Sequence, residues 1–520
     1  MPVLCLLWLP GCGLETAATR GTFRVALQDD PHSLDPAVGY DVPTWSLEHL
    51  LFESLVTFGN DQHIEPALAS SWRQPDPRTY VFTLKRAHFH DGRPVRSRDV
   101  VASLNRLLAP STRSPGATFY TGIEGADACL TGKALAATGI SAPDDRTVRI
   151  VLKTPDPIFL HKLAMPFASV LPEDVAAKDA QRKPVGTGPF RLLSWRRGEK
   201  MVFVRHSPPP ASPPPTRLPA PIQRVEVGLG VHENIEVLKF ERGELDVIGA
   251  LRNIPAADFV RLSQQTPAGC RMFRGNDAAV QYVTINAEMP PFDRREVRRA
   301  IAQAIDKQRI VQLVNGRGTP AAGILPPGIP GYDPDFRGLS HDPAESRRAL
   351  VKAGYPSGFA VTYGCVANDT QRKVAQAIQQ DLARIGVNVT IKPMAFPTYL
   401  QAKSTRGQVQ IGSGNWSQDY PDPSNFLVTL YHSKNIREVD SLNDSFYRNP
   451  EVDRLFDLAE RTASPRARWE SFRRAEALII EDAPVVPLYH PIKCHLTGPR
   501  VRGYGLHPVW GLDLTGVELN

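Results

Sequence analysis

Residues 359–391 carry the pattern that most constrains the fold of this chain. Apolar residues alternate along 359–363 and again along 387–391, as on half-buried strands, and between them they recur every three or four residues, as on one face of a helix. Gly386 follows the helical stretch, where glycine is common because the backbone often turns left-handed there. A strand, a helix and a second strand in so short a span predict a parallel pair with a right-handed crossover, and therefore an α/β fold.

The rest of the chain repeats this alternation. Strands are predicted at 80–84, 148–151 and 485–489, and helices at 45–55, 97–108, 293–306, 374–385 and directly after residues 449 and 464. Asp293 is the predicted N-cap of the clearest helix, with Glu296 three residues later. Ser97, Asn449 and Ser464 are predicted caps of other helices. A chain of 520 residues exceeds a single hydrophobic core, so two or three lobes are expected.

A proline-rich stretch runs from residue 207 to residue 221. Proline lacks the backbone N–H that a sheet ladder needs, so this stretch cannot lie inside a sheet. We interpret it as a surface excursion between strands at 201–204 and 225–227.

The N-terminus is typical of the end of a secretory signal that is followed by a lipoprotein box. Leu9, Gly11 and Cys12 form the box, and the Cys12 thiol would carry the lipid. Pro10 is unusual inside such a box, and Arg20 is the first basic residue. No apolar run approaches the ~18 residues of a membrane-spanning helix. The sequence therefore predicts a protein held at the membrane through a lipid anchor only.

Cysteines and charge exclude several functions. Four cysteines lie beyond the N-terminal segment, far apart and without a Cys-x-x-Cys pair: Cys129, Cys270, Cys365 and Cys494. This spacing excludes zinc ribbons and thioredoxin-like sites, and it is compatible with one disulfide or with free thiols. The net charge of +7 is scattered along the chain, which argues against a nucleic-acid partner.

No catalytic or metal-binding motif is complete in this chain. His232 and Glu233 begin like a zinc-protease helix, but the second histidine is missing. His88 and His90 alternate beside a turn without a third ligand nearby. Neither a phosphate loop nor a Gly-x-Ser-x-Gly motif is present. We therefore expect neither a cofactor nor a metal, and these motifs assign no catalytic reaction to the chain.

From about Ala26 onward, the chain resembles family 5 of the extracellular solute-binding proteins, the dipeptide-, oligopeptide- and nickel-binding subunits of ABC importers. The stretches that carry the resemblance follow one another along the chain: Leu34-Asp35-Pro36-Ala37, Leu51-Phe52-Glu53-Ser54-Leu55, Glu65-Pro66-Ala67-Leu68-Ala69 with Trp72, Tyr80-Val81-Phe82-Thr83-Leu84, Phe89-His90-Asp91-Gly92, Gly186-Thr187-Gly188-Pro189-Phe190, Gly243-Glu244-Leu245-Asp246, Asn286, Pro291-Phe292-Asp293, Val297-Arg298-Arg299-Ala300-Ile301 and Trp416 to Phe426. Each is short, and their common order makes the resemblance specific. The chain departs from the family where the proline-rich stretch replaces a short Asn-Pro-Asp-Tyr-Trp-like segment.

The resemblance implies a two-lobed periplasmic-binding-protein fold of type II, in the large class with an additional inserted lobe. A signal segment would occupy residues 1–12. Lobe I would comprise residues 22–50, 185–268 and 484–520. The inserted lobe would span residues 51–184, and lobe II would span residues 269–483. Ligand would bind in the cleft, and hinge closure would bury it. A membrane permease would then recognise the closed form. A monomer in the periplasm or cell envelope is expected.

The resemblance also implies a ligand site. In peptide-binding members a Trp-x-x-Asp-Tyr loop places its aspartate against the ligand's α-ammonium group, and Asp419 holds that position here. Arg372 matches a position where dipeptide-binding members carry basic residues, and Arg406 is a second candidate for the ligand carboxylate. Trp416 and Tyr420 would line the pocket or pack the loop.

Asp422 directly precedes a proline, and we interpret it as a residue that only shapes the turn. The predicted cargo is a di- or oligopeptide. The alternative is another cargo on the same fold, such as a nickel chelate, haem, a sugar oligomer or an amino-acid derivative.

Overall fold

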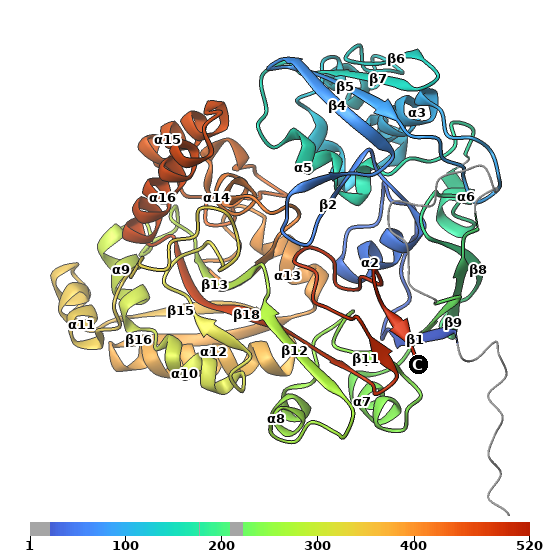
Figure 1. Ribbon diagram of the computed structural model, residues 1–520. Helices are drawn as coiled ribbons and strands as arrows, with labels where there is room; N and C mark the ends of the chain where they lie inside the picture. The colour runs from blue at the N-terminus through green and yellow to red at the C-terminus, as the bar shows by residue number, and fades with distance from the viewer. Residues whose placement is uncertain (1–20, 176, 208–221) are drawn as a thin grey trace, which may run out of the picture.

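The computed structural model describes residues 21–175, 177–207 and 222–520. The chain forms an α/β fold, as predicted, in three lobes (Figure 1). The inserted lobe lies at the top of the view, lobe II on the left and lobe I on the right.

Lobe I is built on a four-stranded sheet. Its order is β1 (Thr22–Ala26), β10 (Arg224–Gly228), β9 (Lys200–Arg205) and β8 (Phe190–Arg196). β1 is parallel to β10, whereas β9 and β10 are antiparallel neighbours on either side of the proline-rich stretch. Helix α2 (Val42–Leu51) packs against β8, and Leu47 and Leu51 enter the core of this lobe.

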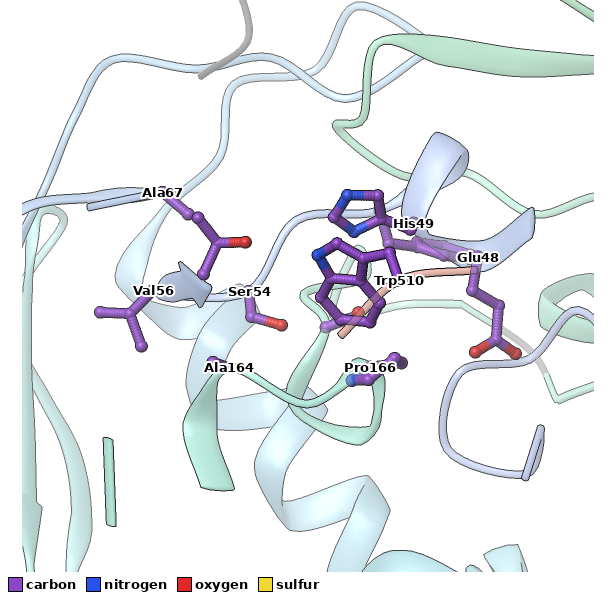
Figure 2. A pocket seen from close by; sticks show the side chains of 11 residues that line it. Glu48, His49, Ser54, Val56, Ala67, Ala164, Pro166 and Trp510 are labelled. Carbon is purple, nitrogen blue, oxygen red and sulfur yellow. The ribbon is translucent and has the colours of Figure 1, made fainter. Parts of the chain in front are cut away.

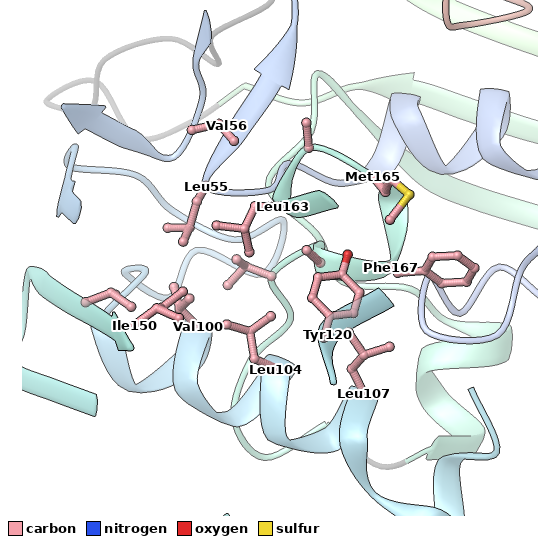
Figure 3. Packing of buried hydrophobic residues seen from close by; sticks show 14 of the residues in the cluster. Leu55, Val56, Val100, Leu104, Leu107, Tyr120, Ile150, Leu163, Met165 and Phe167 are labelled. Atoms are coloured by element: carbon pink, nitrogen blue, oxygen red, sulfur yellow. The ribbon is translucent and has the colours of Figure 1, made fainter. Parts of the chain in front are cut away.

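The inserted lobe has its own sheet and core. The sheet order is β4 (Ala69–Asp76), β5 (Thr79–Leu84), β7 (Thr147–Val151) and β6 (Ile140–Asp144), and α3 (Ser97–Leu108) packs against it. Figure 3 shows Val100, Leu104 and Leu107 of α3 packed with Tyr120 and Leu163. Their spacing of three and four residues places them on one face of α3.

The β-α-β unit predicted from residues 359–391 is confirmed in lobe II. Strand β15 (Phe359–Val366), helix α12 (Asp369–Arg384) and strand β16 (Val387–Met394) follow one another. The strands pair in parallel, from Phe359 opposite Val387 to Val366 opposite Met394. Gly386 has a φ of 87°, the left-handed conformation expected after the helix.

One long strand, β18 (Val485–Thr497), connects the lobes. Its first half pairs with β13 (Ala279–Ile285) and β14 (Gly318–Pro320), and its second half with β12 (Arg271–Asn276) and β11 (Val247–Ile248). On β18 the pairing partner changes between Pro491 and Ile492, and on the opposite segment the change falls between Asn276 and Ala279. Both positions lie further along the chain than the predicted limits of lobe II, residues 269 and 483, and those limits stay predictions.

Several shorter or peripheral helices and strands also belong to the described part of the chain. They are α4 (Ala126–Leu130), α5 (Phe159–Leu163), α6 (Ala177–Arg182), α7 (Glu233–Glu241), α8 (Ala256–Gln264), α11 (Pro343–Lys352), α13 (Phe396–Lys403), β2 (Val56–Phe58), β3 (Ile64–Pro66), β19 (Val501–Arg502) and β20 (Glu518–Leu519).

The structure corrects the predicted helix start at Asp293. Helix α9 spans Arg295–Ala304, and its N-cap is Arg294, which makes no side-chain cap. The Asp293 backbone N–H instead donates to the Met289 carbonyl oxygen, so the chain is still in a turn there. The end of the helix is predicted to within two residues, and a second helix that was not predicted, α10 (Lys307–Leu313), follows it after its own N-cap, Asp306.

One other predicted cap is wrong and two are confirmed as N-cap residues. Ser97 is the first residue of α3, and the Asp99 carboxylate accepts from the Arg96 N–H at 2.8 Å. Ser464 is the N-cap residue of α16 (Pro465–Asp482), with proline at the start of the helix as predicted, although the Ser464 side chain makes no cap hydrogen bond. Asn449 caps α15 (Pro450–Arg461), as predicted, with its side chain accepting from the Glu451 N–H at 3.0 Å.

The predicted lipidation residue, Cys12, lies outside the described residues and stays a prediction. Within the described ranges, no helix is both long and apolar enough to cross a membrane. The four cysteines at 129, 270, 365 and 494 are free thiols.

Candidate functional site

The loop that carries Asp419 lies where lobe II meets lobe I. It connects β17 (Ile411–Ser417) to α14 (Pro423–Tyr431). β17 is parallel to β15, so Asp419 and the first turn of α12 both follow the carboxyl ends of neighbouring parallel strands, where open α/β sheets bind ligands. The neighbouring Gln418 side chain donates from Nε2 to the Pro508 carbonyl oxygen of lobe I at 2.8 Å.

The carboxylate of Asp419 is buried and held in place by one amide. Asp419 is 6% exposed. Nδ2 of Asn425 donates to Oδ2 of Asp419 at 2.8 Å, and the Asp419 N–H donates to Oδ1 of Asn425 at 2.9 Å. Asn425 Oδ1 also accepts from the Trp416 indole N–H at 3.2 Å. Asn425 therefore fixes the direction in which the Asp419 carboxylate points.

Burial changes the acidity of Asp419. Loss of solvation raises its pKa to about 6, although the Asn425 amide and the Tyr40 hydroxyl oppose that rise by hydrogen bonding to the carboxylate. A carboxyl whose pKa is raised by burial is a candidate functional group when it lies at a cleft.

Aromatic rings from all three lobes meet beside Asp419. Tyr40 of lobe I contacts Phe167 of the inserted lobe, with ring centroids 5.4 Å apart. Phe119 of the inserted lobe lies edge-on to Tyr420 of lobe II, with centroids 6.1 Å apart. Tyr420 is 4% exposed and belongs to the core cluster of the inserted lobe. The loop after β17 is thus enclosed by the other two lobes.

Asp422 does far more than shape a turn, contrary to the prediction. It caps α14 by accepting from the Ser424 N–H at 2.9 Å. Its two carboxylate oxygens also pair with the guanidinium of Arg468 in α16, at 2.5 and 2.7 Å, and both side chains are 6% exposed. This buried bidentate ion pair joins the loop to the helix pair behind it, and sequence reasoning missed it because the partner lies 46 residues away.

The two predicted carboxylate-binding arginines differ in their surroundings. Arg372 is exposed in the first turn of α12, and its side chain makes no hydrogen bond or ion pair with the residues that the structure describes. Arg406 pairs with Glu288, Nε to Oε2 at 3.0 Å, and also with Glu438. The contacts of Arg406 support a structural role, whereas the Arg372 side chain remains available to a ligand.

The structure adds three residues that the sequence did not suggest. Asn425 and Arg468 reach the loop from α14 and α16, and Tyr40 reaches it from lobe I. An amide in the first turn of a helix and a tyrosine in a distant loop carry no sequence signal that links them to Asp419. Only the folded chain brings them to Asp419.

A small cavity with a mixed polar and apolar lining lies between α2 and the inserted lobe. Figure 2 shows Glu48, His49 and Trp510 on one side of it and Ala164 and Pro166 across from them. It measures about 20 Å³, room for one water-sized group, and is therefore too small for a peptide. Burial raises the pKa of Glu48, which suits a neutral carboxyl group there.

Lobes joined by one long strand, with a buried carboxylate in a loop between them, define a class of protein: the bilobal solute-binding proteins. The solved structure of clavulanic acid biosynthesis oligopeptide binding protein 2 superposes with a TM-score of 0.86. It is 26% identical, and the match covers 96% of this chain and 95% of that one. The predicted fold class is confirmed.

The chain belongs to a particular family within that class. The sequence profile described as bacterial extracellular solute-binding proteins, family 5 Middle, matches residues 63–438. Dipeptide-binding protein DppE of Bacillus subtilis is 27% identical, over 97% of this chain and 94% of DppE. The probable deoxycholate-binding periplasmic protein YgiS of Escherichia coli is 30% identical, over 94% of this chain and 92% of YgiS. The protein is a solute-binding subunit of an ABC importer and not an enzyme.

Proposed function

We propose that the protein captures peptides with a free α-amino group outside the cytoplasmic membrane and delivers them to a permease when its cleft closes. The observation that carries this proposal is the buried Asp419 carboxylate between the lobes, held through one oxygen by Asn425. A compact ammonium withdrawn from water needs an anionic partner, because an unpaired buried charge is costly. Arg372 is the candidate partner of a ligand carboxylate.

A second cargo class has one observation in its favour. YgiS is named for binding deoxycholate, an anion without an ammonium group, and it is as similar to this chain as the named peptide binders are. A cargo of that kind would leave the Asp419 carboxylate without a cationic partner in the closed cleft. The two candidates therefore differ in whether the ligand carries an amine.

The experiment is to identify the ligand that travels with the protein. Native mass spectrometry of protein purified without refolding should show a peptide mass. Added peptides should then raise thermal stability, because ligand that binds only the folded state stabilises it by ~2.7 kcal/mol at one hundred times its dissociation constant. Bile acids or haem would serve as controls. Stabilisation by one of these and by none of a peptide library would contradict the proposal.

Peptide affinity should depend on pH. The ligand-free Asp419 has a pKa of about 6, and a bound ammonium would lower that pKa by stabilising the carboxylate. Affinity is therefore expected to be highest near neutral pH, where Asp419 is ionised and the peptide amine, with a pKa of about 8, is still charged, and to fall by up to ~tenfold per pH unit below about pH 6. Calorimetric titration across this range tests the expectation, and equal affinity at about pH 5 and about pH 7 would contradict it.

A further inference from the structure

We propose that Gln418 is a positioning residue for cargo capture: its side chain holds lobe II against lobe I at the closed angle. The inference rests on the proposed function only for the closing of the cleft, and it is independent of what the cargo is. Gln418 belongs to lobe II, and its Nε2 donates to the Pro508 carbonyl oxygen of lobe I at 2.8 Å. This hydrogen bond can form only while the two lobes are together.

The contact lies close to the place where the chain passes between the lobes. The Gln418 backbone N–H donates to the Ala278 carbonyl oxygen at 2.9 Å. Ala278 lies between Asn276, where β12 ends, and Ala279, where β13 begins. A hinge motion at this point would rotate the Gln418 side chain relative to lobe I. Hydrogen bonds weaken steeply with distance and misalignment, so this bond is sensitive to the closure angle.

The Pro508 carbonyl is presented by a loop that is itself fixed. Nδ1 of His507 accepts from the backbone N–H groups of Val509 and Trp510, each at 3.1 Å. Nζ of Lys493, on β18, donates to the carbonyl oxygens of His507 at 3.3 Å and of Pro508 at 3.4 Å. The acceptor for Gln418 is therefore held in place from the strand that connects the lobes.

Trp510 anchors the same loop to lobe I and to the inserted lobe. Its ring centroid lies 4.1 Å from that of His49 in α2, beside which Figure 2 shows it, and 6.0 Å from that of Phe58 in β2. Trp510 is 4% exposed and belongs to the core cluster of the inserted lobe. A loop packed against both lobes moves with them, so closure brings Gln418 to Pro508.

The Gln418 side chain has one hydrogen bond to lose. Its Oε1 has no hydrogen-bond partner among the residues that the structure describes, so the Nε2 bond to Pro508 is its one side-chain hydrogen bond there. On the other side of Asp419, Tyr420 packs edge-on against Phe119 of the inserted lobe. Replacement of Gln418 thus removes the hydrogen bond to lobe I and leaves the aromatic contact of Tyr420 in place.

The test is Gln418→Ala, with Gln410→Ala as the matched control. Gln410 directly precedes β17, and its Nε2 donates to the Pro290 carbonyl oxygen at 3.1 Å, within lobe II. Each variant loses one hydrogen bond from a glutamine amide to a proline carbonyl, but only Gln418→Ala loses a bond between lobes. Gln418→Leu, which keeps the bulk of the side chain, is the second test variant.

Spin labels report the distance between the inserted lobe and lobe II. They are attached at Leu135→Cys and Asp440→Cys, both exposed positions, in a Cys270→Ser background, because the other natural cysteines are buried. Distance distributions are recorded without additive, with an equimolar tripeptide library and with deoxycholate. The wild type should show a short and a long distance in at least one of these conditions.

Both Gln418 variants should lower the ratio of short to long distances about 2- to 10-fold, the effect of losing one hydrogen bond. Gln410→Ala should keep the wild-type ratio. A residue that only shapes its own loop would not change the separation of the lobes. An unchanged ratio in both Gln418 variants under all three conditions would overturn the inference, and so would a wild type with a single distance throughout.

The outcomes separate this inference from the peptide assignment. If deoxycholate alone increases the short distance and Gln418→Ala reduces it, the role of Gln418 stands and the peptide assignment is wrong. If the tripeptides increase the short distance equally in the wild type and in both Gln418 variants, the peptide assignment stands and the role of Gln418 is wrong.

Discussion

Replacement of Asp419 by asparagine is expected to weaken the binding of peptides with a free α-amine by two to four orders of magnitude. Asparagine keeps the shape of the side chain and removes its charge, so the ligand ammonium would be buried without a counter-ion. Breaking a buried pair in this way costs about 3–5 kcal/mol, which corresponds to that loss in affinity. Calorimetric titration of the wild-type and variant proteins measures it.

N-acetylation of the peptide makes the complementary change and should weaken binding to the wild type by a similar factor. The two changes should not add, because each removes the same interaction. Asp440→Asn is the matched control, since Asp440 lies exposed on lobe II and should bind like the wild type. Equal affinity of the wild type for free and acetylated peptides would mean that Asp419 is structural and that the ligand assignment is wrong.

The largest effect on stability is expected at the ion pair between Asp422 and Arg468. Either Asp422→Asn or Arg468→Leu would leave the partner charged, buried and unpaired. Such a loss lowers the free energy of unfolding by about 3–5 kcal/mol. If Asp422 only shaped the turn, as the sequence suggested, Asp422→Asn would cost less than ~1 kcal/mol. Chemical denaturation of each variant measures the change.

The double variant separates the charge effect from general damage. Asp422→Asn combined with Arg468→Leu removes both charges, so it should be less destabilised than the sum of the two single variants. The exposed pair of Arg454 and Glu451 on α15 is the control, where Glu451→Gln should cost under ~1 kcal/mol because surface pairs contribute little. Single variants at Asp422 and Arg468 that unfold like the control would contradict the importance of the buried pair.

Much of the fold could be predicted because its signals are local. The alternation along β15 and β16 and the helical spacing of α12 depend only on which face of each element is buried. The parallel pairing follows from the short crossover, and the left-handed Gly386 from helix termination. Predictions failed where the signal was a single residue. Asp293 resembles an N-cap, but the preceding turn at Met289 delays the helix to Arg295.

The sequence by itself determined the class of the protein, the order of its elements and the loop that carries Asp419, because these follow from periodicity and from short motifs in a recognisable order. Only the tertiary structure decided what surrounds that loop. Burial, the Asn425 amide and the Tyr40 hydroxyl together set the pKa of Asp419, and Arg468 gives Asp422 its buried partner. These effects act through space between segments that are distant in the chain, and the free energy of a buried charge depends on such neighbours.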